Sequence, residues 1–293
     1  MSTTAPTTRT LEVPGAVLTY DVRGPLPAAD GVPPLLMVGQ PMDAAGFGTL
    51  AGFFPDRTVV TYDPRGLGRS TRSDGSAEHR PEWQADDLHR LVGALGAGPV
   101  DVFASSGGAV TALRMAAAHP EDVRTLVAHE PPLIAVLPDA DRARAAWQAV
   151  RRAYDERGWG AGMAAFIGLT SWPGEFPEGF GAQLPDPATF GLPTEDDGTR
   201  ADPLLSGASD PVVGFEPDLA GLRAFGARLV VAAGEESRGA MTWRTSAALA
   251  DALGSQLVVF PSNHGGFLGE EYGQAGQPEA FAARLREVLA ARA

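Results

Sequence analysis

Short apolar segments alternate with segments of helical periodicity along most of this 293-residue chain. The apolar segments are rich in valine and leucine and are bounded by glycine, proline or aspartate, which is typical of buried strands. Between them, apolar residues recur at the three-to-four-residue spacing of an amphipathic helix. Because two parallel strands need a long crossover connection, which is usually a helix, the alternation predicts a mainly parallel sheet with helices on both faces. We therefore expect an α/β fold.

The predicted sheet contains eight strands, and helices are predicted between strands and at the end of the chain. The strands are expected at Leu11–Val13, Ala16–Val22, Pro34–Val38, Arg57–Tyr62, Val100–Phe103, Val123–Ala128, Leu229–Ala233 and Gln256–Phe260. The helices of the core are expected at Glu82–Leu95, Gly108–His119, Met241–Leu253 and Ala280–Ala291. Open sheets of this kind bind ligands at the carboxyl ends of their strands. Residues that directly follow a predicted strand are therefore the first candidates for a functional site.

The alternation stops between Pro132 and roughly Pro217. This stretch contains two predicted helices, Ala140–Glu156 and Gly160–Leu169, followed by a region rich in glycine, proline and aspartate. Because core strands are predicted on both sides of it, we interpret it as an insertion, mostly helical, that forms a cap over the carboxyl edge of the sheet. The predicted division is a first part of the core at 1–132, a cap at 133–217 and a second part of the core at 218–293.

Composition excludes several kinds of chemistry. The chain has no cysteine, and all 23 of its basic residues are arginine. Disulfides, thiolate nucleophiles, Schiff bases on lysine and a P-loop lysine are therefore excluded. The formal net charge of −13 argues against nucleic acids and anionic membranes as partners. No apolar run approaches the ~20 residues of a membrane span, and the first residues lack the pattern of a signal peptide, so we expect a cytoplasmic protein.

Ser106 stands where the predicted strand Val100–Phe103 turns sharply into a helix. Its neighbours are small: Ala104 lies two residues before it, and Gly107 and Gly108 follow it. A larger side chain at these positions would collide with the neighbouring backbone of such a tight turn. The turn lifts the serine hydroxyl out of the sheet and points the N–H groups of the helix at a bound group. This arrangement, the nucleophile elbow, makes Ser106 a candidate nucleophile.

A serine nucleophile needs a base, and His264 is the best candidate among five histidines. It follows the last predicted strand in a glycine-rich loop, and it comes after every other candidate in the chain, as the order serine, acid, histidine requires. The other histidines are placed less well for this role. His79 lies in a polar loop and His89 on a predicted surface helix, while His119 ends a predicted helix and His129 ends a predicted strand.

The acid that orients the base has two candidate locations. Glu130 follows a buried strand and is held by two prolines, and a carboxylate there is costly unless it is paired. We therefore favour Glu130, although an ion pair with an arginine of the insertion would explain it as well. Glu235 and Glu236 follow the next predicted strand and remain alternative acids, while solvated loop charges would equally account for them.

The oxyanion of the reaction needs two backbone N–H donors. Gly107 is one candidate, because it directly follows the nucleophile at the start of the helix. Gln40 is the other, since it follows the strand Pro34–Val38, with Gly39 allowing close approach and Pro41 unable to donate. A plain strand-to-helix turn is the alternative interpretation of this segment.

These motifs together resemble the α/β-hydrolase superfamily, in its cap-bearing serine esterase and lactonase-like branch. The resemblance covers nearly the whole chain and includes the turn at Gly39, the elbow, His264 and the segment Asp63-Pro-Arg-Gly-Leu-Gly-Arg-Ser70, which the family uses as a structural turn. Two departures are Ala104, in place of a glycine, and Ser237, where the family usually has its acid. Some branches carry the acid after the earlier strand, where Glu130 stands. The dehalogenases and epoxide hydrolases of the family use an aspartate nucleophile, so Ser106 argues against both reactions.

The resemblance and the residues predict a cofactor-free serine hydrolase that cleaves a carboxylic ester or lactone through an acyl-enzyme. A second interpretation uses the same triad for acyl transfer, C–C hydrolysis or cyclisation of a biosynthetic intermediate. A third, from another class, is a non-catalytic protein of hydrolase-like fold that binds a small molecule.

The sequence leaves open whether the chain is a monomer or a homodimer. The apolar side chains of the insertion indicate an apolar small-molecule substrate. These side chains either line the pocket or form the core of the insertion itself. They are Trp147, Tyr154, Trp159, Met163, Phe166, Trp172, Phe176 and Phe180.

Overall fold

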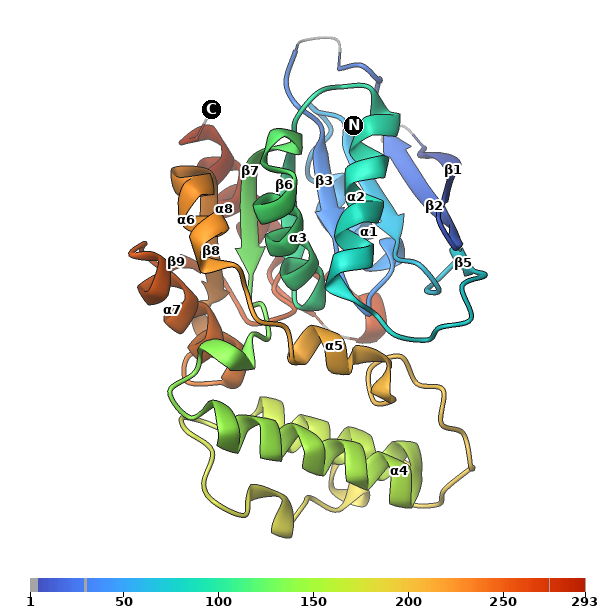
Figure 1. Ribbon diagram of the computed structural model, residues 1–293, viewed down its shortest axis with the longest axis vertical. Helices are drawn as coiled ribbons and strands as arrows, with labels where there is room; N and C mark the ends of the chain where they lie inside the picture. Colours follow the sequence, from blue (N-terminus) through green and yellow to red (C-terminus); the bar gives the residue numbers. More distant parts are fainter. Residues whose placement is uncertain (1–4, 29–30, 274, 293) are drawn as a thin grey trace.

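The computed structural model describes residues 5–28, 31–273 and 275–292, and its centre is a mostly parallel sheet (Figure 1). Nine strands are present in the described part of the chain, and eight of them follow the order β1-β2-β4-β3-β6-β7-β8-β9. Their bounds are β1 Thr7–Val13, β2 Ala16–Arg23, β3 Leu35–Val38, β4 Val59–Asp63, β5 Thr71–Arg72, β6 Val100–Ser105, β7 Val123–His129, β8 Leu229–Gly234 and β9 Val258–Phe260. The predicted number of eight was therefore one too low.

The extra strand is β5, which lies off the main order and pairs antiparallel with β2. It is two residues long and has no apolar run, so nothing in its sequence distinguishes it from a loop. The strand β1 likewise begins four residues before the predicted Leu11, because a polar segment gains ladder partners from β2. Within it, the hydroxyl of Thr8 donates to Asp21 Oδ1 at 2.6 Å. Pairing across the sheet, which is invisible to local periodicity, extended both elements.

The four predicted helices of the core are present with ends shifted by at most two residues, whereas α1, α5 and α6 were not predicted. Their bounds are α1 Gly48–Gly52, α2 Pro81–Leu95, α3 Gly107–Ala118, α4 Ala140–Thr170, α5 Asp210–Val213, α6 Leu219–Phe225, α7 Met241–Leu253 and α8 Pro278–Ala290. Short 3₁₀ turns occupy η1 Ala44–Phe47, η2 Pro120–Asp122, η3 Ile134–Val136, η4 Phe180–Ala182, η5 Pro187–Phe190, η6 Gly207–Ser209, η7 Gly226–Arg228, η8 Glu235–Ser237 and η9 Glu271–Gly273.

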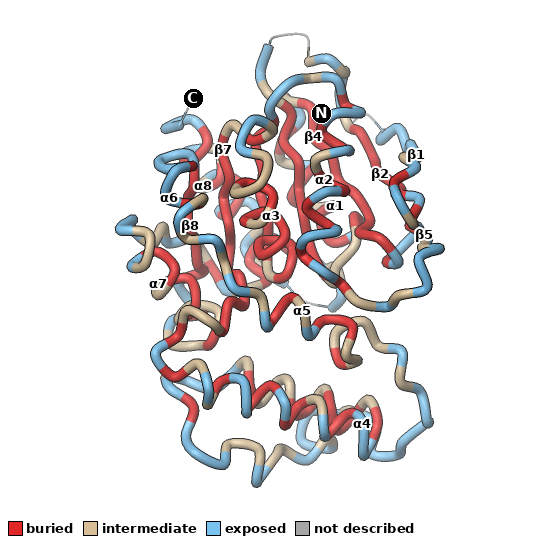
Figure 2. Tube along the Cα trace, in the orientation of Figure 1, coloured by how far each residue is buried: buried red, intermediate tan, exposed pale blue. Residues whose placement is uncertain are grey.

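Helices cover both faces of the sheet, and successive strand residues alternate between two apolar cores. In β6, Val102 and Ala104 face the core beneath α2, α3, α6 and α7. Phe103, between them, faces the core beneath α1 and α8. This two-residue alternation is the geometry of a strand that is buried on both sides, and Figure 2 shows the central strands as buried along their whole length.

The parallel register brings several strand ends to one edge of the sheet. Strand β6 pairs with β7 so that Ser105 lies opposite His129, and β7 pairs with β8 so that His129 lies opposite Ala232. Gly234 of β8 then lies opposite Phe260 of β9. Residues that follow these positions, including Ser106, Glu130 and the loop that carries His264, therefore emerge at the same carboxyl edge.

The segment 133–217 lies beyond that edge, with α4 running across the end to which the β7 arrow points (Figure 1). The two helices predicted here form one element, α4, that is broken at Gly158, where φ is 85°. A Cβ on Gly158 would lie 2.3 Å from Asp196 Oδ1. A glycine is therefore required at the break for both conformation and space.

None of the helices within residues 5–28, 31–273 and 275–292 combines the length and the apolar character needed to cross a bilayer.

Candidate active site

Ser106 sits in a strained turn between β6 and α3. Its φ of 57° and ψ of −131° lie in a region that non-glycine residues rarely adopt, at a cost of about 1–3 kcal/mol. Its N–H donates to the carbonyl of His129 at 3.0 Å, which ties the turn to the end of β7. Ser105 before it and Gly107 after it are buried, whereas Ser106 is partly exposed. The turn therefore presents the Ser106 side chain at the sheet edge and starts α3 directly behind it.

The two glycines of the turn have no room for a side chain. A Cβ on Gly107 would lie 2.1 Å from Gln40 Oε1, and a Cβ on Gly108 would lie 2.4 Å from the carbonyl oxygen of Val38. The helix thus packs directly on the backbone that follows β3. This contact is the structural reason for the small residues that flank Ser106 in the sequence.

We expect Gly108→Ala to lower the free energy of unfolding by about 1–3 kcal/mol, because the added methyl meets backbone that cannot move aside. Gly93→Ala is the matched control, since Gly93 lies in α2 and a Cβ added there would have no neighbouring atom within 4 Å; it should stabilise by about 0.5–1 kcal/mol through helix propensity. Urea denaturation measures both. Equal effects of the two variants would show that the close approach at Gly108 is unimportant.

His264 and Glu130 form a direct hydrogen-bonded pair. His264 Nδ1 lies 2.6 Å from Glu130 Oε2, and the carboxylate is fully buried whereas the imidazole side chain is 45% exposed. Such a pair leaves the other ring nitrogen, Nε2, available to a group outside the pair. The geometry is that of an imidazole oriented by a buried acid.

Three donors hold the Glu130 carboxylate. Oε1 accepts the N–H of Gly234 at 2.9 Å, and Oε2 accepts the hydroxyl of Thr242 at 2.6 Å in addition to His264. Burial by itself raises the pKa of the Glu130 carboxyl, but the hydrogen bonds and charge of His264, with Thr242, outweigh it, so this pKa lies well below its usual range. Glu130 is therefore ionised at neutral pH. Thr242 was not predicted as part of the site, because nothing in its local sequence shows that α7 begins beside Glu130.

The alternative acids lie elsewhere. Glu235 and Glu236 are exposed in η8. Glu236 Oε1 accepts from Gln277 Nε2 at 3.1 Å, and its Oε2 from Ser262 Oγ at 3.4 Å. The structure thus brings Glu130, and not Glu236, into hydrogen-bond contact with His264.

Gln40 follows β3 and packs against the start of α3. It is 3% exposed, and its side chain lies over Gly107. Its Nε2 amide is buried and has no hydrogen-bond partner within the described part of the chain. An orphaned donor beside the nucleophile turn is costly and would be satisfied by an oxygen of a bound molecule. The sequence singled out the backbone of Gln40 only, and the side-chain amide was not foreseen.

His129 occupies a different environment from its neighbour Glu130. Its Nδ1 lies 3.2 Å from Ser105 Oγ, and its ring packs against Phe103 and Phe281. Burial lowers the pKa of His129 to about 4, so the ring is neutral at neutral pH. Its ring belongs to the aromatic packing beneath the sheet edge, and its Nε2 is buried without a hydrogen-bond partner among the described residues.

Hydrogen bonds and an ion pair fix the turn that begins at Asp63. Asp63 accepts the N–H groups of Ala44 at 2.9 Å and Arg69 at 2.8 Å. Arg65 pairs with the buried Asp87 at 2.6 Å. These contacts anchor the loop after β4 beside the loop after β3, which carries Gln40.

Comparison with curated proteins gives partial matches. A family model described as the alpha/beta hydrolase fold matches residues 47–191. An uncharacterised hydrolase, YraK, of Bacillus subtilis (strain 168) is 41% identical over 129 residues, which are 44% of this chain and 46% of that protein. A proline iminopeptidase of Neisseria meningitidis is 39% identical over 101 residues, 33% of this chain and 32% of that protein. The matches thus span less than half of each of these relatives.

Solved structures match over almost the whole chain at low sequence identity. A thermophilic esterase from Thermogutta terrifontis superposes with a TM-score of 0.63 at 21% identity, covering 99% of both chains. A proline iminopeptidase from Mycobacterium smegmatis gives a TM-score of 0.63 at 20% identity, covering 98% of both. At this identity the likeness concerns the fold. The matched family model and the likeness to these solved structures show that this chain has the α/β-hydrolase fold.

Proposed function

We propose that this chain is a serine hydrolase that cleaves a carboxylic ester or lactone of a small, largely apolar molecule. Ser106 is the nucleophile, His264 the general base, and Glu130 the acid that orients the imidazole. The observation that carries the proposal is the 2.6 Å contact between His264 Nδ1 and Glu130 Oε2, at the same sheet edge as a serine in a strained strand-to-helix turn.

In the proposed reaction, His264 Nε2 takes the hydroxyl proton of Ser106 while Oγ attacks the carbonyl carbon. The carbonyl electrons move to oxygen, and the Glu130 carboxylate stabilises the imidazolium. The imidazolium then gives its proton to the leaving alkoxide, which departs as an alcohol and leaves an acyl-enzyme. Water attacks this ester and its proton passes to His264. The C–Oγ bond then breaks, and the imidazolium returns the proton to Ser106 Oγ, which gives the acid and restores both residues.

The oxyanion of each tetrahedral intermediate is assigned to the backbone N–H groups of Gln40 and Gly107. Gly107 is the first residue of α3, where N–H groups lack intrahelical partners and the helix dipole favours negative charge. The side chain of Gln40, whose Nε2 is buried, lies over Gly107. We assign this Nε2 to a second oxygen of the substrate, because it would otherwise remain without a partner.

The segment 133–217 acts in this proposal as a cap that shields the site from water. Several of its aromatic side chains are already used in its own packing: Trp147, Tyr154 and Phe176 are buried in a cluster with Ile134. Packing within the segment therefore accounts for the burial of these three side chains.

A second candidate activity is removal of an N-terminal residue from a peptide, because curated relatives of partial length are named proline iminopeptidase. Amide cleavage would use the same three residues. The two activities differ in the leaving group, which is an amine instead of an alkoxide.

A substrate panel separates these activities. We expect turnover of p-nitrophenyl esters of short and medium acyl chains, or of γ- and δ-lactones, well above that of proline p-nitroanilide. A fluorophosphonate probe should label Ser106, as located by mass spectrometry of the digested protein. Faster cleavage of the anilide would favour the peptidase, and absence of labelling at Ser106 would contradict the proposed nucleophile.

A further inference from the structure

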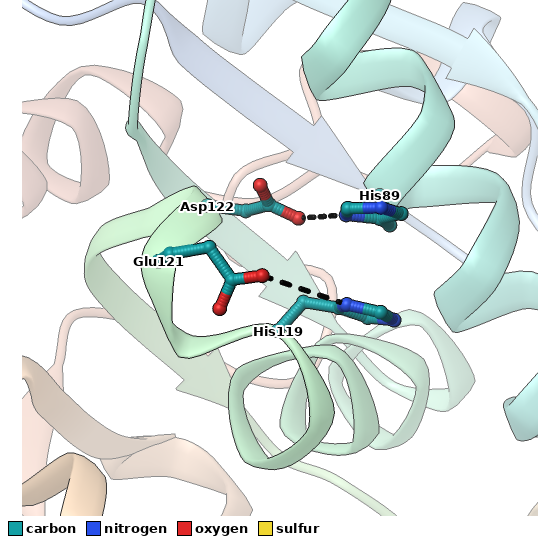
Figure 3. Close-up of side chains that lie close together, drawn as sticks. All are labelled: His89, His119, Glu121 and Asp122. Carbon is teal, nitrogen blue, oxygen red and sulfur yellow. Dashed lines mark hydrogen bonds and ion pairs between the residues drawn. The ribbon is translucent and has the colours of Figure 1, made fainter.

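Two histidines and two carboxylates meet on the surface between the middle of α2 and the C-terminal end of α3 (Figure 3). His89 lies in α2, His119 follows the last residue of α3, and Glu121 and Asp122 belong to η2. One ligand atom from each of the four side chains can be chosen so that all lie within 4.8 Å of one another. None of these residues belongs to the proposed catalytic site.

One histidine of the cluster is hydrogen-bonded to a carboxylate, and the other lies too far from its carboxylate for a hydrogen bond. His89 Nδ1 lies 2.6 Å from Asp122 Oδ2, and the rings of His89 and His119 stack with centroids 4.0 Å apart. In contrast, His119 Nδ1 lies 3.8 Å from Glu121 Oε1. This distance exceeds the usual N–H···O range of about 2.7–3.2 Å. The carboxylate thus faces the imidazole with a gap between them.

We propose that His89, His119, Glu121 and Asp122 form a binding site for one zinc ion. Two imidazole nitrogens and two carboxylate oxygens are a donor set that Zn²⁺ accepts in tetrahedral geometry, at bond lengths of about 2.0–2.2 Å. Such bonds place the ligand atoms roughly 3.4 Å apart. To bind one ion, the stacked rings of His89 and His119, whose planes are 12° apart, must also turn until both planes contain the ion. Mg²⁺ and Ca²⁺ prefer oxygen ligands alone and fit this set poorly.

Asp86 supplies a further contact that suits this assignment. Its Oδ1 lies 3.5 Å from His119 Nε2, on the nitrogen that faces away from Glu121. Histidines that bind metals through one nitrogen usually donate the other N–H to a carboxylate, which fixes the ring. We assign Nδ1 of His119 to the ion and Nε2 to Asp86.

The site is placed to hold two helices together and not to take part in hydrolysis. His119 is separated from Ser106 by the whole of α3, whose 12 residues span roughly 18 Å at the rise of an α-helix. An ion here ties α2 to the end of α3 and to the turn before β7. Because only the folded chain brings these residues together, zinc should stabilise the folded state.

The test is calorimetric titration of the full chain, first treated with EDTA, with zinc sulfate near pH 7.5, together with thermal unfolding. We expect one zinc ion per chain at this site and a melting temperature that rises by several degrees. Mg²⁺ should produce neither effect. His89→Ala and His119→Ala should each weaken zinc binding at least tenfold and abolish the thermal shift.

His264→Ala is the matched control, because His264 is the third histidine with a solvent-accessible side chain and lies at the other end of α3. It should leave zinc binding at the cluster unchanged. Asp122→Asn and Asp86→Asn keep the size of the side chain and give a second test if an alanine variant unfolds. Asp122→Asn should weaken zinc binding at least tenfold. Wild-type affinity in the His89 and His119 variants, or loss of zinc only with His264→Ala, would overturn the proposal. These readouts do not depend on any esterase activity, so they stand apart from the test of the proposed function.

Discussion

Replacing Ser106 by alanine should lower kcat for ester hydrolysis by roughly four to six orders of magnitude. The variant keeps the pocket and the oxyanion donors but cannot form an acyl-enzyme, so KM should change little and the residual rate should come from bound water alone. Steady-state kinetics on the best ester of the panel measures the effect. Circular dichroism and the melting temperature should stay close to those of the wild type, since the Ser106 side chain is partly exposed.

Ser105→Ala is the matched control for that variant. Ser105 precedes Ser106 in the chain but lies buried in β6, where its hydroxyl contacts His129 Nδ1 at 3.2 Å. Its removal should cost stability and leave most of the activity. If Ser105→Ala were the inactive variant, or if Ser106→Ala kept near-native turnover, the nucleophile would be assigned wrongly.

Glu130→Gln should lower kcat by about three to four orders of magnitude, which is the scale of losing the acid of such a triad. Glutamine has nearly the same size, but its amide cannot accept from Gly234, Thr242 and His264 together, and it no longer stabilises an imidazolium. In the wild type, the lowered pKa of Glu130 means that its contribution is present above that pKa and is lost only as the pH falls through it, well below the usual range. Protonation of Glu130 should therefore not contribute to the pH dependence of the wild-type activity between about pH 6 and 9.

Glu236→Gln and Glu235→Gln are the controls, because both residues are exposed and follow the neighbouring strand. Each should keep activity within a few-fold of the wild type. A mild effect of Glu130→Gln, together with a severe effect of either control, would move the acid to η8.

The elements that the sequence predicted well are those with strong local signals. Helix α2 begins one residue before the predicted Glu82 and ends at Leu95 before a left-handed Gly96, as its periodicity and its glycine indicate. The strand β5 was missed because its two residues gain structure only from β2. Similarly, the break in α4 follows from Gly158, whose φ of 85° is easy for glycine but rare for other residues.

The candidate site likewise contains residues with a local sequence signal and residues that only tertiary packing places there. Ser106 was identifiable because a strand, a tight turn with small residues and a helix occupy adjacent positions in the chain. Thr242 and the Nε2 of Gln40 were not identifiable, since each gains its place only when separate elements pack together. The four residues of the proposed zinc site come from the middle of α2, the end of α3 and the turn η2, and no spacing in the sequence marks His89 as their neighbour.

By itself, the sequence determined the α/β fold, the turn at Ser106 and a short list of bases and acids, because these depend on periodicity and on residues close together in the chain. Only the tertiary structure decided which carboxylate contacts His264. The parallel register places the ends of β6, β7, β8 and β9 at one edge, and the donors of Gly234 and Thr242 make a buried carboxylate stable at Glu130. That choice depends on desolvation and hydrogen bonding between segments more than 100 residues apart, which no local pattern records.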